Sequence, residues 1–104
     1  MNDSNKDYGR NIEVLLSKAS VDPRFRAHLL RRRGRAPKKI GLELTQEEIQ
    51  MLDSMSAAHL FAIIKHVIVP PHLQAAFLGT DSAAMREALA VERLMNRMLG
   101  GIRP

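Results

Sequence analysis

The chain has 104 residues, a formal net charge of +5 and no cysteine, which indicates one small domain. Without cysteine there are no disulfides, thiolate metal sites, iron–sulfur clusters or cysteine nucleophiles. The aromatic residues are one tyrosine and three phenylalanines, so the core must rest on aliphatic side chains, which suits helix-on-helix packing.

The sequence shows neither a secretory signal nor a membrane span. Its first residues lack a basic start followed by an apolar run. The longest apolar stretch, Leu60 to Val69, is interrupted by Lys65 and His66 and is too short to cross a bilayer. We therefore expect a cytoplasmic protein without a membrane partner.

The first third of the chain predicts two helices. Residues 1–6 are polar and are expected to be disordered. From about Asp7, apolar residues recur at helical spacing as Tyr8, Ile12, Leu15, Leu16 and Ala19. This helix should end near Ser20. Asp22-Pro23 then provides a capping carboxylate and a first-turn proline, so a second helix should run from there to about Gly34.

The next segment is predicted to be irregular until a third helix begins. Residues 33–39 contain Gly and Pro and no apolar period, which is typical of a loop. Alternating apolar residues over 40–44 predict an extended connector whose two leucines, Leu42 and Leu44, pack into the core. Thr45 and Glu48 form a capping box, which predicts the start of the third helix.

The remainder of the chain predicts three further helices. Ser56 caps a fourth helix that Val69-Pro70-Pro71 ends, and a short fifth helix spans residues 72–78. Thr80 or Asp81 caps the last helix, Ser82 to Leu99, which carries along one side Ala84, Ala88, Val91, Met95 and Met98. We therefore predict an all-α fold, a small bundle of five to six short helices. A single helical domain covers residues 7–99, and residues 100–104 form a flexible tail.

No enzyme signature is visible, and we predict no catalytic residue, metal site or cofactor. His59 and His66 lie seven residues apart with no carboxylate three or four residues from either, unlike metal-binding helices. Glu47 and Glu48 are expected in the first turn of a helix, where they offset the helix dipole, and Asp22, Asp53 and Asp81 at or near helix ends. Serines lack the context of an activated nucleophile.

Two features remain as candidates for binding. A basic block brings together six cations within nine residues: Arg31, Arg32, Arg33, Arg35, Lys38 and Lys39. It is consistent with a solvated, dipole-balancing surface, with an acidic protein partner, or with nucleic acid. The methionine-bearing last helix is consistent with completing the core or with binding a partner, including a second copy in a homodimer.

Three motifs carry a resemblance to a known family: "IEVLLSKA" at residues 12–19, "DPRFRAHLL" at 22–30 and "IGLELTQEE" at 40–48. Over about Ile12 to Ile64 the chain resembles the Nif11-like and nitrile-hydratase-like leaders of ribosomally synthesised, post-translationally modified peptides. The resemblance implies a folded handle that a peptide-modifying enzyme grips. It also implies release of a C-terminal core after a Gly-Gly pair.

The resemblance assigns roles to particular residues. The partner-binding residues would be Phe25, Leu29, Leu42, Leu44 and Glu48, and the sites of modification or cleavage would be Gly100, Gly101 and Arg103. The chain departs from the family because only three residues follow the Gly-Gly pair, and none is Cys, Ser or Thr. Gly-Gly is also an ordinary helix end. The alternatives are a small basic nucleic-acid-binding regulator and a helical accessory subunit of an enzyme.

Overall fold

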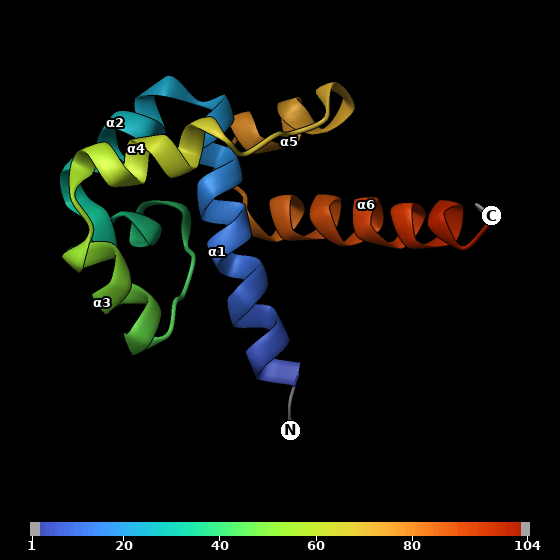
Figure 1. The fold of residues 1–104 in the computed structure, drawn as a ribbon, viewed down its shortest axis with the longest axis horizontal. Helices are drawn as coiled ribbons and strands as arrows, with labels where there is room; N and C mark the ends of the chain where they lie inside the picture. Colours follow the sequence, from blue (N-terminus) through green and yellow to red (C-terminus); the bar gives the residue numbers. More distant parts are fainter. Residues whose placement is uncertain (1–2, 103–104) are drawn as a thin grey trace.

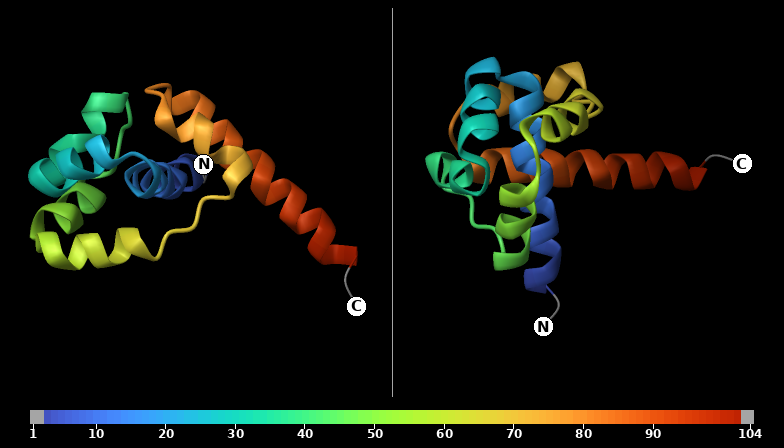
Figure 2. Two further views of the ribbon diagram at one scale, coloured as in Figure 1. Left: turned by 90° about the horizontal axis from the view of Figure 1, so that it is seen from above. Right: turned by 60° about the vertical axis from the view of Figure 1, so that its left-hand side comes forward.

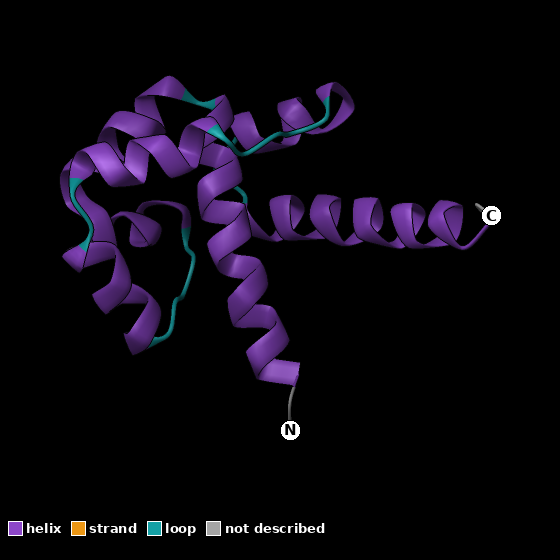
Figure 3. Ribbon diagram, in the orientation of Figure 1, coloured by secondary structure: helices purple, strands orange, loops and turns teal. Residues whose placement is uncertain are grey.

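The computed structural model describes the backbone of residues 3–102 and the side chains of residues 11–98. Over this range the chain is all-α, as predicted, with no strand (Figure 3). Its elements in chain order, shown in Figure 1, are α1 (Asp3–Val21), α2 (Pro23–Arg32), the 3₁₀-helix η1 (Arg33–Ile40), α3 (Gln46–Ser54), α4 (Ala57–Lys65), the 3₁₀-helix η2 (Pro71–Leu73), α5 (Gln74–Leu78) and α6 (Ser82–Ile102).

Helix α1 is the axis on which the other helices pack. It contacts α2, α4, α5 and α6, and it lies near the centre when the molecule is seen from above (Figure 2). Val14, Leu15 and Ala19 are fully buried. Because neighbours surround α1 on several sides, its buried surface is wider than the single predicted stripe and includes the polar residues Asn11, Ser17 and Lys18.

The side chain of Lys18 is only 3% exposed and binds three parts of the chain. Its Nζ donates to Asp22 Oδ2 at 3.0 Å, to the Phe77 carbonyl at 2.9 Å and to the Gly79 carbonyl at 2.6 Å. An ammonium group has three donors, so all of them are used. The contact joins the end of α1 to the start of α2 and to the end of α5.

The helix starts predicted from capping residues are confirmed. Asp22 accepts from the backbone N–H of Arg24 at 3.0 Å, and Ser56 accepts from that of His59 at 3.0 Å. Thr45 and Glu48 form the reciprocal capping box. Asp81, rather than Thr80, caps α6 by accepting from the N–H of Ala83 at 3.0 Å. Each cap satisfies backbone donors that a helix start leaves without an internal partner.

Several predicted boundaries are wrong. Helix α1 begins at Asp3 instead of residue 7, since no proline interrupts its polar first turn. Residues 33–40 form a 3₁₀-helix, not a loop, because burial of Ala36, Pro37 and Ile40 against the core compensates for the poor helical composition. Helix α4 ends at Lys65, and residues 67–70 are irregular because residues before proline avoid helical geometry.

Helix α6 projects from the body of the molecule (Figure 1). Met85 in its first turn is fully buried, whereas Val91, Met95 and Met98 are 49%, 52% and 62% exposed. Of the two alternatives for this helix, completion of the core applies to its first half, through Met85 and the half-buried Leu89. The apolar side with Val91, Met95 and Met98 is left exposed, because α1 covers only the first half of α6, and Ala84 of the same side is exposed as well. The radius of gyration is 14.0 Å, against about 13 Å for an average domain of this length, as expected for projecting helix ends.

We predict that Lys18→Met destabilises the fold by about 3 kcal/mol. The substitution keeps most of the side-chain volume but leaves the Phe77 and Gly79 carbonyls and the Asp22 carboxylate without their donor. Denaturant unfolding followed by circular dichroism measures the effect. The control is Lys65→Met, at an exposed lysine of α4, which should change stability by less than about 1 kcal/mol. Equal effects of the two substitutions would refute this account of Lys18.

Candidate functional site

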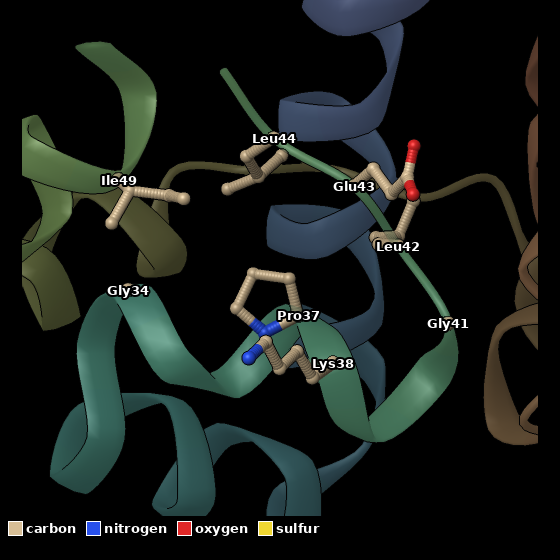
Figure 4. Close-up of a pocket in the computed structure, with 8 residues that line it drawn as sticks. All are labelled: Gly34, Pro37, Lys38, Gly41, Leu42, Glu43, Leu44 and Ile49. Carbon is tan, nitrogen blue, oxygen red and sulfur yellow. The ribbon is translucent and has the colours of Figure 1, made fainter. Parts of the chain in front are cut away.

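A groove of about 470 Å³ lies between η1, the connector of residues 41–45 and the start of α3. We call it the connector groove. Figure 4 shows Pro37, Leu44 and Ile49 around its interior, with Lys38 beside Pro37 and with the Glu43 carboxylate turned away from these three side chains. Its lining residues are Gly34, Pro37, Lys38, Gly41, Leu42, Glu43, Leu44 and Ile49. The groove therefore combines an apolar interior with charges of both signs.

A glycine turn and two hydrogen bonds fix the path of the connector beside η1. Gly41 adopts a left-handed conformation with φ of 69°, which glycine accepts without steric cost and which turns the chain out of η1. The Leu42 N–H donates to the Pro37 carbonyl at 3.0 Å, and the buried Asn11 Nδ2 donates to the Glu43 carbonyl at 2.7 Å. No local pattern in the sequence marks Asn11, because its partner lies 32 residues away.

Gly34 sets the distance between η1 and α3 at one end of the connector groove. Its N–H donates to Asp53 Oδ1 at 2.9 Å. A Cβ on Gly34 would lie 2.7 Å from Ile49 Cγ2 and 2.8 Å from Asp53 Oδ1, which is closer than atoms pack. This glycine is required by close approach, because only a hydrogen atom fits between the two segments.

We predict that Gly34→Ala destabilises the protein by about 1–3 kcal/mol, because the added methyl group must push α3 away from η1. Thermal and denaturant unfolding measure the change. Gly79→Ala is the matched control: no atom lies within 4 Å of the place that its added methyl group would occupy, so stability should be unchanged or slightly higher. A Gly34→Ala protein as stable as the wild type would contradict the tight η1–α3 contact.

Most of the predicted partner-binding residues are not available to a partner at the surface. Phe25, Leu29 and Leu42 are 4%, 0% and 4% exposed, so their side chains support the surface instead of forming it. Glu48 uses its side chain to accept from the Thr45 N–H at 2.9 Å, which commits it to the helix cap. Of the five, Leu44 is the one half-buried apolar residue that lines the connector groove.

The basic block does not form one uniform surface. Arg33 is half-buried, and its side chain donates to the Leu30 carbonyl at 2.7 Å and to the Met55 carbonyl at 3.3 Å. It therefore ties α2 to the end of α3. The other five members are exposed: Arg31, Arg32, Arg35, Lys38 and Lys39. Arg31 and Arg32 belong to α2, and those on η1 do not share one side, since Lys38 lines the connector groove and Lys39 lines a second hollow.

Two titratable groups near α2 have shifted pKa values. Burial lowers the pKa of His28, and the neighbouring cations Lys39, Arg31 and Arg32 lower it further. Burial alone would raise the pKa of Asp22. The Lys18 ammonium and the backbone N–H groups of Phe25 and Arg24 together outweigh that effect and hold the pKa below its usual value. His28 is therefore kept neutral in a positive environment, while Asp22 is kept ionised.

The proposed processing residues lie at the end of α6 or beyond the described range. The backbone of Gly100 and Gly101 is helical, since α6 continues to Ile102, so the predicted end of the helix at Leu99 is wrong. Glycine costs only about 1 kcal/mol per residue in a helix, which a last turn tolerates. Arg103 lies outside the described residues.

Metal-binding and membrane-spanning features are absent from the described range. No three histidine or carboxylate side chains converge there in a way that would hold a metal ion. No helix in that range has both the length and the apolar character that crossing a membrane requires.

Comparison of the chain with protein-family models, with curated proteins and with solved structures finds no match. The resemblance to peptide leaders therefore rests on the three motifs alone, and the function built on it is a proposal.

Proposed function

We propose that this protein is a leader or carrier module in the biosynthesis of a ribosomally made peptide, bound in the cytoplasm by a peptide-modifying enzyme. The observation that carries the proposal is the connector groove. Its lining, from Gly34 to Ile49, overlaps the "IGLELTQEE" motif through which the chain resembles peptide leaders. Residues 41–44 of the motif therefore line a groove that a segment of a partner can occupy.

The chemistry of the connector groove suits a peptide-like segment of a protein partner. Leu44 and Ile49, both half-buried, offer an apolar interior above the buried Pro37, in which one or two side chains can anchor. Lys38, which also lines the groove, offers a positive charge that sets the orientation of the bound segment. The partner-binding surface proposed is therefore Leu44 with the other exposed parts of the groove, with Phe25, Leu29 and Leu42 supporting it from beneath.

The direction of α6 is consistent with an enzyme that binds the chain at the connector groove and modifies it at its C-terminal residues. Helix α3 and the far end of α6 lie on opposite sides of α1 (Figures 1 and 2). An enzyme that holds the connector groove would leave the C-terminal residues free to enter an active site. We retain Gly100, Gly101 and Arg103 as the proposed positions of modification or cleavage.

We predict that Leu44→Asp abolishes enzymatic modification. A carboxylate in the apolar interior should weaken binding of the maturation enzyme at least about tenfold, as expected for loss of a central anchor. The chain is co-expressed with the maturation enzyme encoded beside it, and intact mass and co-purification are measured.

Met51→Asp is the matched control, because Met51 is an exposed apolar residue of α3, 44% exposed, outside the groove lining. It should be modified as the wild type is. Two results would sink the proposal: an unmodified wild-type chain beside a competent enzyme, or a folded Leu44→Asp variant that is modified normally.

A second proposal concerns self-association through α6. Val91, Leu94, Met95 and Met98 recur at helical spacing and are about half exposed or more, so they form one apolar face. An unpartnered face of this kind typically contacts another protein. We propose that it pairs with the same face of a second copy. The alternative of an accessory subunit uses the same face against a larger enzyme.

We predict that the protein is dimeric and that Leu94→Glu makes it monomeric, because the charge would be buried at the centre of the shared face. Light scattering coupled to size exclusion measures the mass. Asn96→Glu adds the same charge on the opposite side of α6 and should leave the dimer intact. A monomeric wild-type chain would refute the dimer.

A further inference from the structure

A second hollow, of about 350 Å³, lies on the other side of η1 from the connector groove. We call it the basic hollow. Its basic side chains come from three elements: Arg24 and Arg31 lie with the neutral His28 on one face of α2 at helical spacing, Lys39 comes from η1, and the buried Lys18 comes from α1. Buried Phe25 and Ile40 contribute to the lining. The complete lining is Lys18, Asp22, Arg24, Phe25, His28, Arg31, Lys39, Ile40 and Thr80.

The cations of the basic hollow lack a balancing negative charge. Asp22 is the one carboxylate in the lining, and it is already paired with Lys18 at 3.0 Å. Among residues 11–98, none of Arg24, Arg31 and Lys39 forms an ion pair. Burial lowers the pKa of His28, which lies in the same lining, and the neighbouring cations Lys39, Arg31 and Arg32 lower it further.

We propose that the basic hollow is an anion site that binds a carboxylate side chain from an acidic segment of a protein partner. Arginine presents a planar set of donors that matches a carboxylate, and two arginines and a lysine around one depression can bind it jointly. The volume lies at the lower end of the roughly 300–1,000 Å³ range of ligand pockets, which suits one or two side chains. This proposal does not depend on the proposed leader function.

A protein partner fits this surface better than nucleic acid does. A duplex offers regularly spaced phosphates and binds best to a continuous positive face. Here the positive charge does not continue past η1, because the connector and the first turn of α3 beyond it carry the exposed Glu43 and Glu47. A single concave site enclosed by cations is instead matched to one projecting acidic group.

The experiment compares two double variants with equal charge change, drawn from the same basic block. Arg31→Gln with Lys39→Gln removes two cations of the basic hollow, and Arg32→Gln with Arg35→Gln removes two that line neither hollow. All four residues are exposed, so both proteins should fold, which circular dichroism checks. Each protein is titrated at low salt with a short all-glutamate peptide and with duplex DNA, while NMR follows the His28 ring.

We expect the peptide to bind the wild type and to raise the pKa of His28, since a bound anion stabilises its protonated form. The hollow variant should lose about tenfold or more in affinity, and the control variant about twofold or less. Three results would overturn the proposal: no peptide binding, equal weakening in both variants, or DNA binding that is tighter than peptide binding. The readout needs no maturation enzyme, so it stands apart from the test of the connector groove.

Discussion

The buried ammonium of Lys18 is the constraint on which the arrangement of helices depends. A buried charge is costly unless every donor is satisfied, and here the three acceptors come from Asp22, Phe77 and Gly79. Two of them lie 59 and 61 residues further along the chain. The end of α5 must therefore return to α1, and α6 starts from that point. The polar contact fixes the place from which α6 starts, and burial of Met85 anchors its first turn against the core.

The 3₁₀-helix η1 divides the surface around it into two sites of different character. With about three residues per turn, consecutive side chains of such a helix point in different directions. Lys38 accordingly lines the connector groove and Lys39 the basic hollow. The charges that are contiguous in the sequence are therefore divided between two sides of η1. A partner that covers η1 would contact both sites, one largely through apolar groups and the other through charge.

Arg33 illustrates how position changes the role of a charged residue. It has φ of 48°, a conformation that non-glycine residues adopt at a cost of about 1–3 kcal/mol. Its side chain donates to the carbonyls of Leu30 and Met55, and these bonds offset the strain while joining α2 to α3. The arginine thus stabilises the frame of the connector groove, whereas its neighbours Arg31 and Arg32 remain at the surface.

Local signals in the sequence were sufficient to predict the all-α fold and the starts of four helices. Asp22, Thr45 with Glu48, Ser56 and Asp81 act on backbone groups within three residues of themselves, so no distant contact is needed to identify them. Tertiary packing decided which apolar residues reach the surface. Phe25, Leu29 and Leu42 are buried because α1, α4 and η1 enclose them, while Met95 and Met98 are exposed because α1 covers only the first half of α6. Periodicity marks an apolar face, but only the placement of the neighbouring helices decides whether that face is covered.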